Sequence, residues 1–263
     1  MTRFDRDTAV TRVDDGVFEA TIDPGWRITR GPNGGYVSAI LLRALTEAVD
    51  DPGRAPRTFT VHFTAPPEEA PVRIETAIER SGRSLTTVSG RMFQEGRLCA
   101  VTLAAFSRSW PGPEFQDVTM PEVAPPEEAE HLTPGTTFWI PMRARYEQHA
   151  LCLGPDDRAL DGGWVRLEEP RLADALLVAA LASCWPPSVR SKLPEGLPRG
   201  VPTVELTIHF RTTLPLPEAK PDDFYLARFG TGVAREGFFE EEGEIWSRSG
   251  ILVAQSRQLG LFL

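Results

Sequence analysis

Two short segments of the chain are nearly the same strand written twice: Phe59-Thr60-Val61-His62-Phe63 and Leu206-Thr207-Ile208-His209-Phe210. They lie 147 positions apart. Each follows an apolar segment with helical spacing and precedes a run of alternating residues punctuated by glycine. A chain that repeats one supersecondary unit is typically two copies of one domain. The sequence therefore predicts a duplicated domain, which can build a cleft between its halves.

The first half predicts a helix followed by four antiparallel strands. The helix is expected over 36–49, where apolar residues at helical spacing make a broad buried face. It follows the loop Gly31-Pro32-Asn33-Gly34-Gly35, whose three glycines give the backbone unusual freedom. Strands are expected in the ranges 16–22, 26–29, 58–64, 72–80, 84–94 and 97–108, separated by turns rich in proline and glycine.

The second half repeats this order. A helix is expected over 172–184, and because it is apolar all round it should be buried on nearly every side. The acidic run Glu240-Glu241-Glu242 is interpreted as a solvated hairpin turn without a function. Strands are expected in the ranges 138–148, 163–167, 203–212, 223–232, 238–247 and 251–262.

The composition excludes several classes of protein. A formal net charge of −9 over 263 residues argues against a nucleic-acid backbone as partner. The cysteines Cys99, Cys152 and Cys184 have no paired spacing, so neither a disulfide framework nor a metal site is expected. The N-terminus lacks the apolar core of a signal peptide, and no apolar run is long enough for a membrane span. We expect a cytoplasmic protein that needs no cofactor.

Four motifs in order carry a resemblance to a known family. Pro32-Asn33-Gly34-Gly35-Tyr36 leads into the first helix, and Leu181-Ala182-Ser183-Cys184-Trp185 ends the second. The segments 203–210 and 250–260 follow. Together they make the chain similar to the double-hotdog acyl-CoA thioesterases (thioesterase II, TesB-like). The resemblance implies an α+β tandem hotdog, in which two curved antiparallel sheets each wrap around a long central helix.

The duplicated pattern also predicts where the chain divides. We expect an N-terminal hotdog over residues 1–109, a proline-rich linker over 110–136, and a C-terminal hotdog over 137–263. The tandem repeat already supplies the pair that single hotdogs make by association. Assembly into a homo-oligomer through sheet edges is left open.

The resemblance implies a set of catalytic residues in the second half, formed by an aspartate, a threonine and a glutamine. The threonine falls on Thr203 and the glutamine on Gln258. The aspartate falls on Cys184, or on Ser183 if the register slips by one, so the expected carboxylate is missing. Thr203 and Gln258 can orient a water by hydrogen bonds, but neither is a competent general base at neutral pH.

Asn33, Gly34 and Gly35 are the expected substrate-binding residues. Backbone N–H groups at a helix N-terminus are unpaired and carry positive partial charge, which suits an oxyanion. Glycine there also lets a substrate approach the backbone. The alternative interpretation is a loop that needs glycine for tight packing.

Comparing the two repeats separates scaffold from candidate site. His62 and His209 occupy equivalent positions, which favours a structural role, whereas Gln258 aligns with Ala104, which suggests a one-sided site. Thr203 faces the side of its apolar neighbours only if the chain bends where its strand begins. Cys184 is either a nucleophile or a small buried residue that ends a helix.

The sequence therefore predicts an acyl-CoA thioesterase that hydrolyses a fatty acyl-CoA by direct attack of water. The missing aspartate motivates an alternative, a non-hydrolytic acyl-binding protein that kept the fold and lost the base. A hotdog dehydratase is weaker, because it would want a histidine on a central helix and neither predicted helix carries one.

Overall fold

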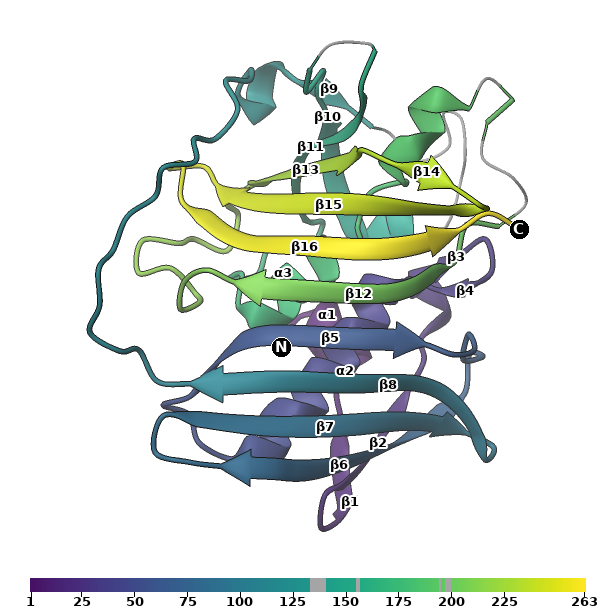
Figure 1. The fold of residues 1–263 in the computed structure, drawn as a ribbon, viewed down its shortest axis with the longest axis vertical. Coiled ribbons are helices and arrows are strands. Elements are labelled where there is room, and N and C mark those ends of the chain that lie inside the picture. The colour runs from purple at the N-terminus through teal and green to yellow at the C-terminus, as the bar shows by residue number, and fades with distance from the viewer. Residues whose placement is uncertain (133–140, 155–156, 194, 197–199) are drawn as a thin grey trace.

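One continuous antiparallel sheet of fourteen strands runs through both halves of the chain, and its middle strands face the viewer in Figure 1 while the strands at its two ends lie behind them. The computed structural model describes residues 1–132, 141–154, 157–193, 195–196 and 200–263. The strand order is β1-β2-β6-β7-β8-β5 in the first half, continuing as β12-β16-β15-β13-β11-β10-β9 in the second, with β14 paired to β15. Two further short strands, β3 and β4, pair with each other. The tandem hotdog predicted from the sequence is thus present.

The first repeat follows the predicted element order, with a short N-terminal helix and strand that the sequence did not predict. Its central helix α2 begins two residues earlier than expected, at Gly34, because the Asn33 side chain caps the helix there. The element bounds are α1 Arg3–Asp7, β1 Thr11–Asp14, β2 Val17–Thr21, β3 Arg27–Ile28, β4 Gly31–Pro32, α2 Gly34–Val49, β5 Ala55–Phe63, β6 Pro71–Ser81, β7 Leu85–Gln94 and β8 Arg97–Ser107.

The second repeat departs more from its prediction. Its helix α3 spans only Ala175–Leu181, because the Asp174 side chain accepts from the Leu177 N–H at 3.0 Å and so caps the helix late. Residues 141–145 form a 3₁₀ turn where a strand was expected, and 138–140 lie outside the described residues. The strands are β9 Glu130–His131, β10 Tyr146–Ala150, β11 Ala159–Leu167, β12 Thr203–Phe210, β13 Tyr225–Thr231, β14 Ala234–Arg235, β15 Phe238–Ser247 and β16 Leu252–Leu261.

The repeated strand joins the two halves. β5 and β12 pair antiparallel side by side at the centre of the sheet (Figure 1). Thr60 lies opposite Thr207, and their hydroxyl oxygens are 2.9 Å apart. Equivalent residues of the two repeats therefore meet at the centre, as a local two-fold axis between antiparallel strands requires.

Both helices pack behind the sheet in a shared core. α2 is buried along most of its length, and so is α3, in agreement with their broad apolar faces. The segment 108–125 contains no helix or strand. It nevertheless lies against the second repeat, because the Gln116 side chain bonds the Leu252 N–H at 2.9 Å and the Gly250 carbonyl at 2.9 Å. No described helix is long and apolar enough to cross a membrane.

Candidate active site

A cavity of about 570 Å³ opens where α2 begins and α3 ends. Asn33 fixes this junction, because its Oδ1 accepts from the Tyr36 N–H at 3.1 Å while its Nδ2 donates to the Ser183 carbonyl at 2.7 Å. The predicted residues Asn33, Cys184, Thr203 and Gln258 all line the cavity. Its other described lining includes Ile28, Met142, Arg143, Trp185, Pro186, Pro187, Arg190 and Val201. The cavity therefore lies between the two repeats, with a polar end and a largely apolar wall.

Thr203 and Gln258 are in direct contact. The Thr203 hydroxyl donates to Gln258 Oε1 at 2.9 Å, and the Gln258 side chain is 8% exposed, so it does not lie on an open strand face. The register of β12 against β16 shifts between Thr203 and Glu205. A register shift of this kind bends a strand. It matches the condition under which Thr203 was expected to face the same side as its apolar neighbours.

A carboxylate lies behind this pair. Gln258 Nε2 donates to Glu241 Oε1 at 2.5 Å, and the Ser188 N–H donates to Glu241 Oε2 at 2.5 Å. The interpretation of residues 240–242 as a solvated turn is wrong, since Glu241 sits in the middle of β15 and is 3% exposed. Burial raises the pKa of Glu241 to about 7, against the opposing effect of the hydrogen bonds from Ser188 and Gln258.

The alternation of β15 was the signal that could have found this residue. Phe239 and Ile245 are buried, and residues an even number of positions apart share one face of a strand. Glu241 therefore points inward with them, while Glu242 is exposed. The run of three glutamates obscured the two-residue alternation of the strand, because a charged residue such as Glu241 is not expected to be buried.

Cys184 is in the cavity wall without the surroundings of a nucleophile. Its backbone carbonyl accepts from Gln148 Nε2 at 3.0 Å, and the residue is 1% exposed. Burial raises the pKa of its thiol far above the ordinary value. No hydrogen bond links the thiol to a basic side chain among the described residues, so this environment favours packing over nucleophilic attack.

Gly34 and Gly35 have different surroundings. A Cβ on Gly35 would lie 2.4 Å from the Ala180 carbonyl oxygen of α3, so this glycine is required by the close approach of the two helices. A Cβ on Gly34 would meet only the Phe63 ring at 3.4 Å and the Ser183 hydroxyl at 3.8 Å. Among the described residues, neither backbone N–H donates to an acceptor. Neither glycine is among the described residues that line the cavity, but Gly34 follows the cavity-lining Asn33 and is the better placed of the two to serve a substrate.

Arg143 and Arg190 line the same cavity, and Asp161 contacts its wall from outside the lining. Asp161 accepts from Trp185 Nε1 at 2.8 Å and pairs with Arg190. Arg143 has no ion-pair partner among the described residues. Burial and the nearby Arg190 both lower the pKa of the Arg143 guanidinium, which nevertheless stays a cation at neutral pH.

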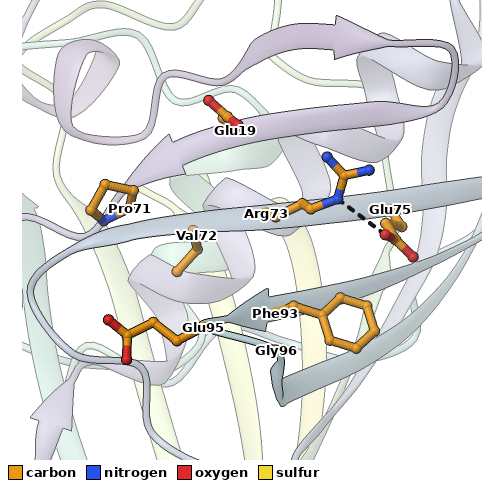
Figure 2. A pocket seen from close by; sticks show the side chains of 8 residues that line it. All are labelled: Glu19, Pro71, Val72, Arg73, Glu75, Phe93, Glu95 and Gly96. Atoms are coloured by element: carbon orange, nitrogen blue, oxygen red, sulfur yellow. Dashed lines mark hydrogen bonds and ion pairs between the residues drawn. The ribbon is translucent and has the colours of Figure 1, made fainter.

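Two other features carry less chemistry. A surface hollow on the first repeat has a volume of about 470 Å³, and Arg73 pairs with Glu75 there at 3.1 Å. Figure 2 shows its lining residues, none of which is a predicted site residue. His131, Glu147 and His149 could together offer three metal ligands. However, Arg166 already lies 2.7 Å from one oxygen of Glu147, and its cation opposes a metal there.

Comparisons with known proteins show which family the chain belongs to. A family model described as the acyl-CoA thioesterase N-terminal domain matches residues 22–107, and one described as the C-terminal domain matches residues 111–262. No curated protein matches the chain by sequence.

Solved structures extend the likeness over the whole chain. A hotdog-fold protein of unknown function from Alicyclobacillus acidocaldarius is 27% identical, with a TM-score of 0.89 over 100% of this chain and 98% of that one. A Thermobifida fusca protein provisionally assigned as a thioesterase II is 27% identical, with a TM-score of 0.85 over 99% of each chain. An acyl-CoA thioesterase II of Mycobacterium marinum, 19% identical, shares the fold with a TM-score of 0.79 over 99% of this chain and 98% of that one.

Proposed function

Because the chain belongs to the acyl-CoA thioesterase family and thioester hydrolysis is its activity, we propose that it hydrolyses fatty acyl-CoA by direct attack of water held by Gln258 and Thr203. The observation that carries this proposal is the hydrogen-bonded Thr203–Gln258 pair at the polar end of the cavity. Both side chains have oxygen lone pairs that can accept a hydrogen bond from water and so aim the water oxygen at a carbonyl carbon.

The reaction needs little else from the protein. The water oxygen bonds to the acyl carbon and the carbon–sulfur bond breaks. One water proton ends on the departing sulfur, and the other leaves to solvent as the carboxylic acid that forms ionises. The thiolate is a good leaving group, so no strong general acid is required. The oxyanion that forms on the way is stabilised by backbone N–H groups where α2 begins, for which Gly34 is the best candidate.

The cavity walls match the two ends of an acyl-CoA. Its apolar side, which includes Ile28, Met142 and Val201, suits a fatty acyl chain. Arg143 supplies a cation without an ion-pair partner among the described residues, in a protein whose formal net charge is −9. We assign it to the phosphates of coenzyme A, which a guanidinium binds through charge-assisted hydrogen bonds.

The non-hydrolytic alternative rested on the lack of a carboxylate near the catalytic pair. A carboxylate does adjoin the pair, because Glu241 bonds Gln258 directly. No feature of the described structure or of the related proteins favours binding without turnover.

The test compares Gln258→Ala with a matched glutamine variant. Gln255 lies on the same strand but bonds Arg211 outside the cavity, so Gln255→Ala serves as the control. We expect Gln258→Ala to lose about 100-fold in kcat on acyl-CoAs of several chain lengths, with acyl-CoA binding retained. Equal turnover by Gln258→Ala and Gln255→Ala would refute the assignment.

A further inference from the structure

We infer that Glu241 is a positioning residue of this site, which holds the Gln258 amide with its oxygen toward Thr203 and the cavity. Glu241 does not line the cavity, so it acts through Gln258 and not on the substrate. The inference rests on the proposed function, because it assigns Glu241 a part in the same hydrolysis.

The hydrogen bonds dictate the direction of the amide. One oxygen of Glu241 accepts from the Ser188 backbone N–H, a group that can only donate. The other oxygen faces Gln258, and an ionised carboxylate can only accept, so Gln258 must present its NH₂ there. Gln258 Oε1 is then left for the Thr203 hydroxyl and for a water in the cavity.

The fold by itself does not require these polar groups. Thr60 and Thr207 are equivalent residues of the two repeats, because they lie opposite each other at the centre of the sheet. In the neighbouring strand pairs, Gln258 lies opposite Leu206 and Ala104 lies opposite Phe59. The polar set of the second repeat therefore has a buried apolar counterpart in the first: Thr203, Glu241 and Gln258 correspond to Pro56, Val88 and Ala104.

This comparison weighs against a purely structural role. A carboxylate at 3% exposure is expensive to bury, and the first repeat reaches the same local architecture with Val88 in its place. Thr203 and Gln258 line the cavity at the start of α2, whereas Pro56 and Ala104, their counterparts, are not among its described lining residues. The buried carboxylate of Glu241 thus occurs in the repeat whose glutamine, Gln258, lines the cavity.

Protonation of Glu241 reverses the arrangement. The proton can sit only on the oxygen that faces Gln258, because the Ser188 N–H occupies the other. The amide must then turn its oxygen to Glu241 and its NH₂ to Thr203. Besides burial, the negative charge of Asp161 on β11 also raises the pKa of Glu241, and Asp161 itself forms an ion pair with Arg190. Turnover should therefore rise with pH as Glu241 ionises.

Glu241→Gln tests the inference with little change of shape. A glutamine at 241 must give its oxygen to the Ser188 N–H and its NH₂ to Gln258, which locks the reversed amide at every pH. We expect kcat to fall about 100-fold, with the unfolding temperature within about 3 °C of the parent. Glu242→Gln, the same change at the exposed neighbouring position, should leave turnover unchanged.

Two further measurements separate the possible failures. The parent should lose turnover as the pH falls through about 7, and the residual turnover of Glu241→Gln should lack that step. Adding Glu241→Gln to Gln258→Ala should cause no further loss. A folded Glu241→Gln with parental turnover, or a flat parental profile from about pH 5.5 to 8.5, would overturn the inference. If Gln258→Ala itself is fully active, the proposed function fails first.

Discussion

Replacing Gly35 by alanine should loosen the contact between the two central helices and destabilise the protein. The added Cβ would lie 2.4 Å from the Ala180 carbonyl oxygen and 3.1 Å from the Ala180 Cα, and contacts under 3.0 Å are essentially never made by real Cβ atoms. The obstacle is backbone of α3, which cannot turn aside as a flexible side chain would. The two helices must therefore separate where Asn33 joins them.

The size of the effect follows from two opposed contributions. Overpacking a rigid contact costs about 1–3 kcal/mol, occasionally more. Alanine recovers up to about 1 kcal/mol of helix propensity relative to glycine, and less at the first turn. The free energy of unfolding should therefore fall by about 1.5 kcal/mol, which corresponds to a lowering of the unfolding temperature by roughly 3–6 °C at this chain length.

Gly34→Ala is the matched control. Its Cβ would make only ordinary contacts, the nearest at 3.4 Å from the Phe63 ring, so its stability should stay within about 0.5 kcal/mol of the parent. Thermal and urea unfolding of both variants measure the difference. A Gly35→Ala protein as stable as the parent would refute the close-packing argument. Loss of turnover by a fully stable Gly34→Ala would instead support the substrate role of that glycine.

Other consequences follow from single groups. Cys184→Ala should keep kcat/KM within about threefold of the parent in a thioester hydrolysis assay, because burial keeps the thiol protonated; a loss above about 100-fold would reinstate it as a nucleophile. Arg143→Ala should raise KM for acyl-CoA about tenfold and leave KM unchanged for the same acyl group on a short uncharged thiol; equal effects on both would remove its phosphate role. Burial raises the pKa of Asp5, but hydrogen bonds from Arg171 and Thr2 outweigh burial and lower this pKa to about 2. Asp5→Asn should therefore cost about 2 kcal/mol in urea unfolding at neutral pH, and the difference should vanish as pH falls from about 4 to 2; a constant difference would contradict this linkage.

The sheet was predictable because its strands are half-buried. Period-two alternation locates β6, β7 and β16 to within a few residues, and the repeated segment identifies β5 and β12 as equivalent strands. The repeat also indicates that Ala104 and Gln258 correspond, as the strand registers of the structure show. These features are local or periodic, so one sequence can carry them.

The missed features depend on three-dimensional context. The register shift beside Thr203 leaves no sequence signature, yet it decides which way that hydroxyl points. Glu241 bonds Gln258 across neighbouring strands and Ser188 across 53 positions of the chain, so no local motif links the three. The length of α3 was overestimated because apolar residues continue past its C-terminal end at Leu181, and because Leu172 and Ala173 precede the Asp174 cap and so lie outside the helix.

The most direct test of the account is the rate of acyl-CoA hydrolysis by Gln258→Ala beside Gln255→Ala and the parent, with acyl-CoA binding measured on the same samples. Loss of thioester ultraviolet absorbance is a suitable signal, because the exposed Cys152 would react with a thiol reagent. We expect a fall of about 100-fold in kcat for Gln258→Ala alone, with binding unchanged. Parental turnover by Gln258→Ala would contradict this expectation and place the reaction elsewhere in the molecule.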